Sequence, residues 1–377
     1  SLEVRGALTG TMDTPRTFTR VATRLDAAAS GAQFPQGVKL AADLSAARAA
    51  TGETYRLAVV AAGQEIANVT ADLPRGAPMI AGAWKLDVRD AEVAPFAFGK
   101  PLPAFTVVGA GAFDTDVRLS AVRVSGRLNA TVDRLQIFMP ELVVLGELTI
   151  GTEFDLAQSA GGIAVRKLEA TAAAAAPIAS VRALQAFEFN WQTREVRASD
   201  LARELFGLEL HGAPVAWAQP FLKDIAVTGG PVRGQLVANA RSGGVTLRST
   251  APLRIEGVRV VRAGETLVER VDVALNASAD YTPHGWQAEI AALDVQSGAA
   301  KVLTLAAKAG QLAGRDQAVK ATGTLTVDLP ALLAQPVAAG VLTLTGGEAV
   351  VEFVGSLQTT SEIHAKVSLA NLATNVD

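Results

Sequence analysis

The sequence predicts an all-β fold made of an antiparallel-rich sheet with a few short helices. Stretches of strict apolar–polar alternation recur from near the first residue of the 377-residue chain to almost the last. Side chains on a strand point alternately to opposite faces, so each stretch indicates a strand with one apolar and one solvated face. Gly, Pro, Asp and Asn separate the stretches at short intervals, which is typical of a sheet built from neighbouring strands.

The strand candidates follow one another along the whole chain. The two clearest alternations are residues 271–279 and residues 363–369. A tight turn at residues 283–285, Pro-His-Gly, is predicted to join two strands as a hairpin, because Pro and Gly supply the backbone angles of a reversal. The other candidates are residues 55–60, 65–73, 83–88, 116–124, 128–137, 142–150, 245–248, 253–260 and 286–295.

Helical segments are predicted at few places. Ser199 or Asp200 can cap a short helix over residues 201–206. A second short turn is expected after Pro214, and Asp328 is expected to cap a third that begins with Leu and Pro. Each of these segments follows a strand and leads through a proline-containing link to the next strand.

We therefore expect one continuous, elongated β segment over residues 1–377. Subdivisions are expected near residues 90–105, 199–222 and 328–337, where the helical links lie. Their spacing is irregular, which predicts a sheet that grows by adding strands and not a solenoid with a fixed period.

Composition restricts the classes of function. Hydrophobic residues make up 49% of the chain but aromatic residues only 5%, so Ala, Val and Leu dominate and smooth apolar surfaces are expected. The net charge is −3 with both signs interspersed, so no nucleic-acid partner is expected. The chain has no cysteine, which excludes disulfides and thiolate chemistry. No segment has the pattern of a signal peptide or a membrane span.

The sequence shows no catalytic constellation. His211, His284 and His364 lack metal-ligand spacing, and the Gly109-Ala-Gly111 stretch has neither the third glycine nor the following helix of a dinucleotide loop. We therefore predict that the protein is not an enzyme and has no catalytic residue, metal or cofactor. A glycosidase whose distant carboxylates converge in the fold is a remote alternative.

Four stretches together resemble the AsmA-like superfamily, the TamB/YdbH-type intermembrane lipid-transport proteins of Gram-negative bacteria. They are residues 126–135, 252–260, 323–333 and 340–344, of which 323–333 combines a strand, an Asp cap and a Leu-rich turn. The resemblance implies a long sheet curled into a β-taco-like trough with an apolar floor, a periplasmic location and a role in outer-membrane biogenesis. It also implies that the chain is a piece of a longer protein, whose membrane or membrane-anchored regions lie outside this segment.

The leading hypothesis is that the chain shields and conducts phospholipid acyl chains along an apolar groove between the inner and outer membranes. The alternative is a structural or adhesive β-sandwich or stalk with a closed core and no lipid, which would show the same alternation. The residues predicted to line the groove are Leu142, Val144, Leu148, Ile150, Val271, Val273, Leu275, Ile363, Val367 and Leu369.

Overall fold

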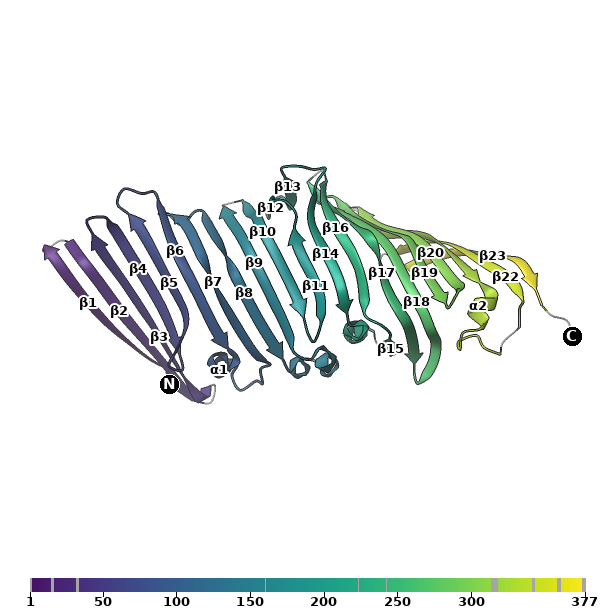
Figure 1. Cartoon of the computed structure of the whole chain (residues 1–377), viewed down its shortest axis with the longest axis horizontal. Helices are drawn as coiled ribbons and strands as arrows, with labels where there is room; N and C mark the ends of the chain where they lie inside the picture. The colour runs from purple at the N-terminus through teal and green to yellow at the C-terminus, as the bar shows by residue number, and fades with distance from the viewer. Residues whose placement is uncertain are drawn as a thin grey trace. The chain divides into compact units, whose positions relative to one another are not determined.

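The structure is a computed structural model (Figure 1). Its chain divides into two compact units. Unit 1 spans Ser1–Ala175 and unit 2 spans Ala176–Asp377. This boundary coincides with none of the three subdivisions expected from the sequence. The residues that the structure describes are 2–14, 17–31, 34–159, 161–222, 224–241, 243–312, 318–340, 343–357 and 361–374.

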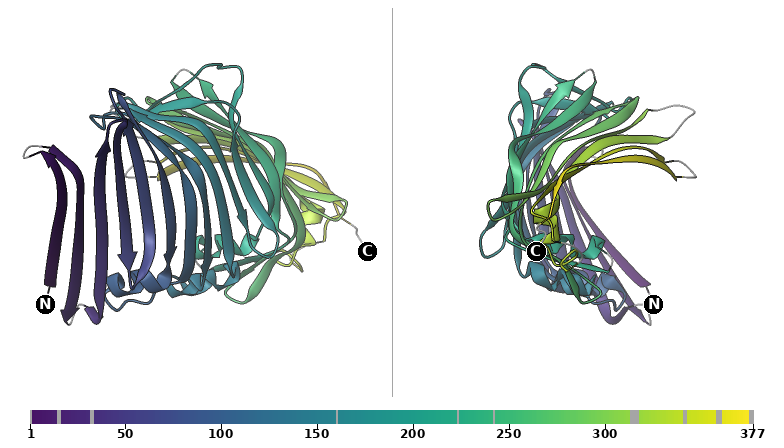
Figure 2. Two further views of the ribbon diagram at one scale, coloured as in Figure 1. Left: turned by 60° about the vertical axis from the view of Figure 1, so that its left-hand side comes forward. Right: turned by 90° about the vertical axis from the view of Figure 1, so that its right-hand side faces the viewer.

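Unit 1 is a meander in which each strand pairs antiparallel with the next along the chain. Its strands are β1 (Leu2–Thr14), β2 (Thr17–Gly31), β3 (Phe34–Ala49), β4 (Gly52–Ala61), β5 (Gln64–Pro74), β6 (Met79–Arg89), β7 (Ala104–Asp116), β8 (Val122–Asp133), β9 (Leu148–Ser159) and β10 (Gly162–Ala173). Helical turns α1 (Asp90–Val93) and η1 (Ala94–Ala97) join β6 to β7, whereas η2 (Leu135–Ile137) and η3 (Pro140–Leu145) join β8 to β9. The left view of Figure 2 shows these turns at the lower ends of the strands.

Unit 2 is also a single antiparallel sheet in its described residues. Its strands are β11 (Pro177–Ala183), β12 (Phe187–Asn190), β13 (Glu195–Ala198), β14 (Glu204–Ala213), β15 (Ile225–Thr228), β16 (Val232–Arg241), β17 (Gly244–Arg262), β18 (Glu265–Thr282), β19 (Gly285–Ser297), β20 (Ala300–Leu312), β21 (Val319–Asp328), β22 (Gly346–Leu357) and β23 (Ser361–Ala373). β12 and β13 form a hairpin, β14 lies between β11 and β16, and β16 pairs with β17. From β17 to β23 each strand again pairs with the next, while β15 adds to the far end of β17.

The predicted fold class is confirmed: the protein is all-β, with a curled antiparallel sheet that does not close on itself and a few short helices. The right view of Figure 2 shows how strongly the strands of unit 2 bend. Register shifts interrupt the β17–β18, β18–β19 and β19–β20 pairings. Such bulges increase local twist, which accounts for curvature at this part of the sheet.

Two local predictions are confirmed. β18 ends at Thr282 and β19 begins at Gly285, so residues 283–284 form the predicted tight turn. Helix α2 (Leu329–Leu333) follows Asp328, whose Oδ1 accepts a hydrogen bond from the backbone N–H of Ala331 at 2.8 Å. This carboxylate satisfies a helix N–H that has no intrahelical partner. The short turn expected after Pro214 is the 3₁₀ helix η4 (Val215–Phe221).

The strand predicted over residues 116–124 is wrong. β7 ends at Asp116 and β8 begins at Val122. Asp116 Oδ1 accepts hydrogen bonds from the backbone N–H groups of Arg118 (3.0 Å) and Ser120 (2.8 Å), which closes a turn. Leu119 in this turn has a positive φ of 56°. The Asp side chain therefore competes with strand geometry, as Asp commonly does.

The helix predicted over residues 201–206 is also wrong. Asp200 Oδ1 accepts from the backbone N–H of Ala202 at 2.9 Å, but the turn goes no further and β14 begins at Glu204. Leu205 is 1% exposed and packs with Val196 and Ala240 in a small core. Burial of this leucine between paired strands outweighs the local helical preference.

Leu142 and Val144 lie in a helical turn and not in the strand predicted over residues 142–150. They belong to the 3₁₀ helix η3, and β9 begins only at Leu148. Pro140 occupies the first turn of η3, and the backbone N–H of Leu142 donates to Met139 O at 2.9 Å. Proline fixes φ at a helical value and removes a strand donor, which favours the turn.

Candidate functional site

One face of unit 2 is aliphatic across seven consecutive strands. We call this surface the apolar face of unit 2. It comprises the alternate residues on β17 to β23 whose side chains lie on the same side of the sheet as Leu275. Seven residues of this face lie directly opposite one another in successive paired strands. We call them the leucine row, although its last two members are valines: Leu253, Leu275, Leu293, Leu305, Leu325, Val351 and Val367. A second row runs beside it: Ile255, Val273, Val295, Leu303, Val327, Ala349 and Leu369.

A row of alanines on the same face makes a hollow beside these bulky rows. Ala279, Ala288, Ala309 and Ala321 lie opposite one another on β18, β19, β20 and β21. They line a groove of about 310 Å³, which leucines and Ile290 also border. Because a methyl group is much shorter than a leucine side chain, the alanine row forms a floor that crosses the strands. The groove therefore follows the direction in which the sheet grows.

The large side chains of the apolar face range from buried to exposed: Val327 is buried, the leucines of β18 to β20 are half-buried, and Ile363, Val367 and Leu369 of β23 are exposed. Leu275, Leu293 and Leu305 each retain partial exposure, whereas Val271 is only 2% exposed. In the described part of unit 2 the strands form one sheet, so no second described sheet covers this face. The face is thus shielded mainly by its own neighbouring side chains.

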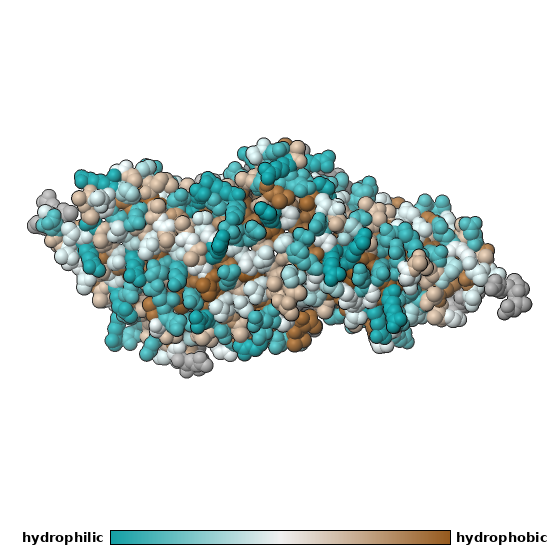
Figure 3. Space-filling view, viewed as in Figure 1, coloured by the Kyte–Doolittle hydropathy of each residue, from teal (hydrophilic) through white to brown (hydrophobic). Residues whose placement is uncertain are grey.

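The opposite face of unit 2 is polar and carries ion pairs between neighbouring strands. Lys308 Nζ lies 3.1 Å from Glu289 Oε1, and Lys301 Nζ lies 2.9 Å from Asp294 Oδ1. The Lys301 ammonium, together with the Thr304 hydroxyl, holds the pKa of the Asp294 carboxyl below its ordinary value. Figure 3 looks onto a side of the molecule where hydrophilic side chains predominate along the strands. The two faces of the sheet therefore differ sharply in polarity.

Unit 1 has an apolar face of the same kind, in which an aromatic ring replaces part of the aliphatic floor. Trp84 lies opposite Gly111, which pairs with Gly126, which in turn pairs with Phe154. The indole lies against Gly126, where an added Cβ would be 2.5 Å from Trp84 Cζ2, and a Cβ on Gly111 would meet the backbone of Ser125 and Gly126 instead. Trp84 stacks on Phe154 with ring centroids 6.1 Å apart, and its Nε1 donates to Ser125 O at 3.2 Å. We call Gly111 and Gly126 the glycine seat of Trp84.

The structure places the predicted lining residues in three different settings. Val273, Leu275, Ile363, Val367 and Leu369 lie on the apolar face of unit 2, and Val271 lies on this face but is buried. Leu148 and Ile150 lie on the apolar face of unit 1, opposite Val132 and Ala130 of β8. Leu142 and Val144 lie outside the sheet in η3.

Sequence reasoning missed the alanine row and the glycine seat. Both arise from small residues placed opposite one another on strands that are separate in sequence. Alternation identifies the face of each strand but not which residue of the next strand lies opposite. Isolated glycines inside strand patterns, such as Gly111 and Gly126, were the one available signal of close approach.

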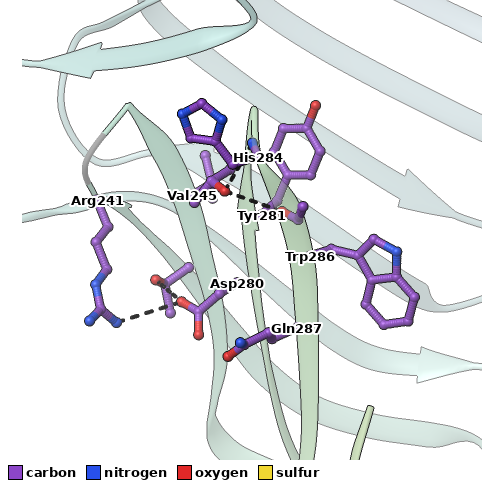
Figure 4. Close-up of a pocket in the computed structure, with 10 residues that line it drawn as sticks. Arg241, Val245, Asp280, Tyr281, His284, Trp286 and Gln287 are labelled. Carbon is purple, nitrogen blue, oxygen red and sulfur yellow. Dashed lines mark hydrogen bonds and ion pairs between the residues drawn. The ribbon is translucent and has the colours of Figure 1, made fainter. Parts of the chain in front are cut away.

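A polar pocket of about 300 Å³ lies at the turn between β18 and β19 (Figure 4). Asp280 accepts a short hydrogen bond from Thr246 Oγ1 and lies 3.8 Å from Arg241 Nη1. The backbone N–H of His284 donates to Thr282 Oγ1 at 3.3 Å. These groups bond to one another within the hairpins and show no nucleophile paired with a base. The described residues likewise contain no group of three or more His, Cys, Asp or Glu suited to a metal ion.

Within the described ranges, no helix has the length and apolar character needed to cross a membrane. Comparison of the chain with protein-family models, with curated proteins and with solved structures found no match.

Proposed function

We propose that the chain shields and conducts phospholipid acyl chains along the apolar faces of its sheet, in the periplasm of a Gram-negative bacterium. The observation that carries this proposal is the continuous aliphatic face of unit 2, which is half-buried on β18 to β20 and exposed on β23, with an alanine-floored groove crossing its strands. The sequence resemblance to the AsmA-like superfamily supports the same function. Membrane-anchored regions outside this segment are the proposed partners.

The energetic reason for such a surface is the cost of moving acyl chains through water. A phospholipid exposes roughly 30 methylenes, and at ~0.8 kcal/mol each their hydration costs on the order of 20 kcal/mol. Contact with an aliphatic surface removes part of this cost, while the head group stays in water. The alanine row crosses four strands, which at ~4.8 Å per strand is about 15 Å. That length matches one leaflet of acyl chain, since a bilayer's hydrocarbon core is about 30 Å thick.

The composition of the floor favours movement over tight capture. The groove walls offer leucine on β16 and β17 and isoleucine on β19, beside alanines on β18 to β21. Dispersion contacts of this kind are individually weak and are almost the same at each strand. A chain shifted by one strand exchanges one set of aliphatic contacts for a nearly equal set.

The alternative, a structural or adhesive β-protein with a sealed core, requires a second layer over the apolar face. In a sealed sandwich the leucine row would be buried by side chains of the facing sheet. Partial exposure of Leu275, Leu293 and Leu305 favours the lipid-binding proposal.

Native mass spectrometry of the chain, purified from a bacterial periplasm without detergent, tests the proposal. We expect adducts at phospholipid masses that disappear on organic extraction, with phospholipid recovered in the extract. A folded protein of apo mass that also takes up no added phospholipid would reject lipid carriage and favour the structural alternative.

A further inference from the structure

Large apolar side chains are exposed at one end of unit 1, outside the sheet. β6 and β8 run in the same direction because both are antiparallel to β7, so the turns that follow them lie at the same end of the sheet. These turns carry six large apolar side chains that are each between 39% and 62% exposed. We call them the apolar rim of unit 1: Phe96 (40%), Phe98 (60%), Phe138 (62%), Met139 (39%), Val143 (60%) and Val144 (49%). Figure 3 shows strongly hydrophobic side chains gathered at the lower margin of the molecule.

Phe98 and Phe138 are the two most exposed phenylalanines among the described residues. A buried phenylalanine removes roughly 200 Å² from water, so Phe98 and Phe138 together leave on the order of 240 Å² of ring surface in solvent. The two groups of turns adjoin, since Arg134 before η2 lies 3.9 Å from Asp90 of α1, and large exposed apolar side chains that gather at one place mark interaction sites on soluble proteins. Backbone hydrogen bonds, such as the one that Phe138 N–H donates to Leu135 O at 3.0 Å, form η2 and η3. The folding of these turns therefore does not require large apolar side chains in solvent.

The rim lies next in the chain to the apolar face of unit 1. η3 leads after Gly146 and Glu147 into β9, whose Leu148 and Ile150 lie on that face, and Ile150 is 40% exposed. An acyl chain leaving a bilayer at the rim would thus have to pass only Gly146 and Glu147 along the chain before it reached the aliphatic side chains of β9. A protein partner docked on the rim would instead block this path.

We propose that the apolar rim of unit 1 inserts into the head-group and acyl boundary of a phospholipid bilayer. This inference rests on the proposed function, and it assigns a membrane contact to this chain itself. The rim consists of projecting turns rich in Phe, Met and Val, which is the form and chemistry of interfacial insertion and not of a groove for a peptide. Lys100 follows η1, so its ammonium can reach the lipid phosphates while its alkyl stem stays near the rim. Arg134, which precedes η2, lies 3.9 Å from Asp90 of α1, so its charge is already paired within the chain.

Site-specific labelling provides the test, because the chain has no cysteine of its own. A single cysteine introduced as Phe138→Cys carries an environment-sensitive NBD label, and the protein is mixed with phosphatidylcholine vesicles. The matched control is Leu119→Cys, a 68% exposed leucine in the β7–β8 turn at the opposite end of the strands. We expect NBD emission at position 138 to shift to the blue and rise several-fold, with no change at position 119. An equal response at both positions, or none at 138, would overturn the proposal.

A second variant measures how much the rim contributes to binding. The double change Phe138→Ser and Val143→Ser removes two large exposed side chains, so the fold should persist, as circular dichroism can check. We expect flotation with the same vesicles to fall on the order of tenfold or more. Unchanged flotation would refute the rim as the membrane contact. Adding phosphatidylglycerol to the vesicles should change binding little, because acidic Glu147 and Asp90 balance the basic residues nearby.

The outcomes separate this inference from the proposed function. A chain that carries phospholipid in native mass spectra but binds no vesicles would refute the membrane contact and leave lipid carriage intact. A chain that binds vesicles through position 138 but never carries lipid would support the contact and reject carriage.

Discussion

Replacing Leu275 with aspartate distinguishes an open apolar face from a sealed core. Leu275 is half-buried in the leucine row, between Leu253 and Leu293. Complete burial of a leucine stabilises by about 1.5–3 kcal/mol, so Leu275→Ala should lower the free energy of unfolding by about 1 kcal/mol. Leu275→Asp also places an incompletely hydrated carboxylate at this position, so it should lower the free energy of unfolding by about 2 kcal/mol in total. In a sealed core the alanine change alone would cost about 2–5 kcal/mol.

The matched control is Asn276→Asp, which places the same charge one residue away on the opposite, solvated face. Urea unfolding followed by circular dichroism measures stability, and native mass spectrometry with lipid extraction measures bound phospholipid. We expect Leu275→Asp to stay folded and to lose lipid, and Asn276→Asp to resemble the wild type in both. Loss of folding in Leu275→Ala, or full retention of lipid in a folded Leu275→Asp protein, would refute the reasoning.

Three further changes test how the units are stabilised. Gly126→Ala should destabilise unit 1 by about 2 kcal/mol and alter the near-ultraviolet circular dichroism of Trp84, because the added Cβ would lie 2.5 Å from the indole; an unaltered spectrum would contradict the glycine seat. Arg123 donates to both oxygens of Asp155 at 2.8 and 2.6 Å and lowers the pKa of this carboxyl, so the wild type should exceed Arg123→Met in stability by about 1 kcal/mol at pH 6. Because the Asp155 carboxyl has a lower pKa in the native state than in the unfolded state, its ionisation stabilises the fold above the unfolded pKa of about 3.9, and this stabilisation is lost as the pH falls through the native pKa. The stability difference between the two proteins should therefore vanish in acid unfolding experiments. A difference that persists at low pH would exclude the ion pair as its source. Asp328→Ala should cost about 1 kcal/mol in urea unfolding through loss of the α2 cap, and Asp328→Asn should recover most of it.

Much of the fold follows from alternation, because the period of two identifies both a strand and its buried face. Alternation predicts strands over residues 271–279 and 363–369, and the apolar residues of both lie on the apolar face of unit 2. The Asp328 cap was also predictable, since its hydrogen bond is local in sequence. Features that depend on a few consecutive residues are therefore accessible without the structure.

The errors arise where local patterns are ambiguous or where distant pairing decides. Residues 142–150 show apolar spacing that suits a strand, yet Pro140 favours a 3₁₀ turn over their first part. Leu205 follows a capping Asp, which predicts a helix, but it lies in β14 because it is buried there against Val196. The groove required knowledge of register, because Ala279 and Ala288 become neighbours only when β18 and β19 pair.

The meander of unit 1 has a kinetic consequence. Each of its strands pairs with the next one along the chain, so most interstrand contacts join residues close in sequence. Local contacts close small loops and favour rapid hairpin formation, and stability then accumulates from neighbour to neighbour, as in repeat proteins. Amide hydrogen exchange should accordingly be slow in central β5 to β8 and fast in β1, whose Leu2 and Leu8 are 75% and 74% exposed. Such a sheet can open strand by strand from β1 while the Trp84 region stays folded.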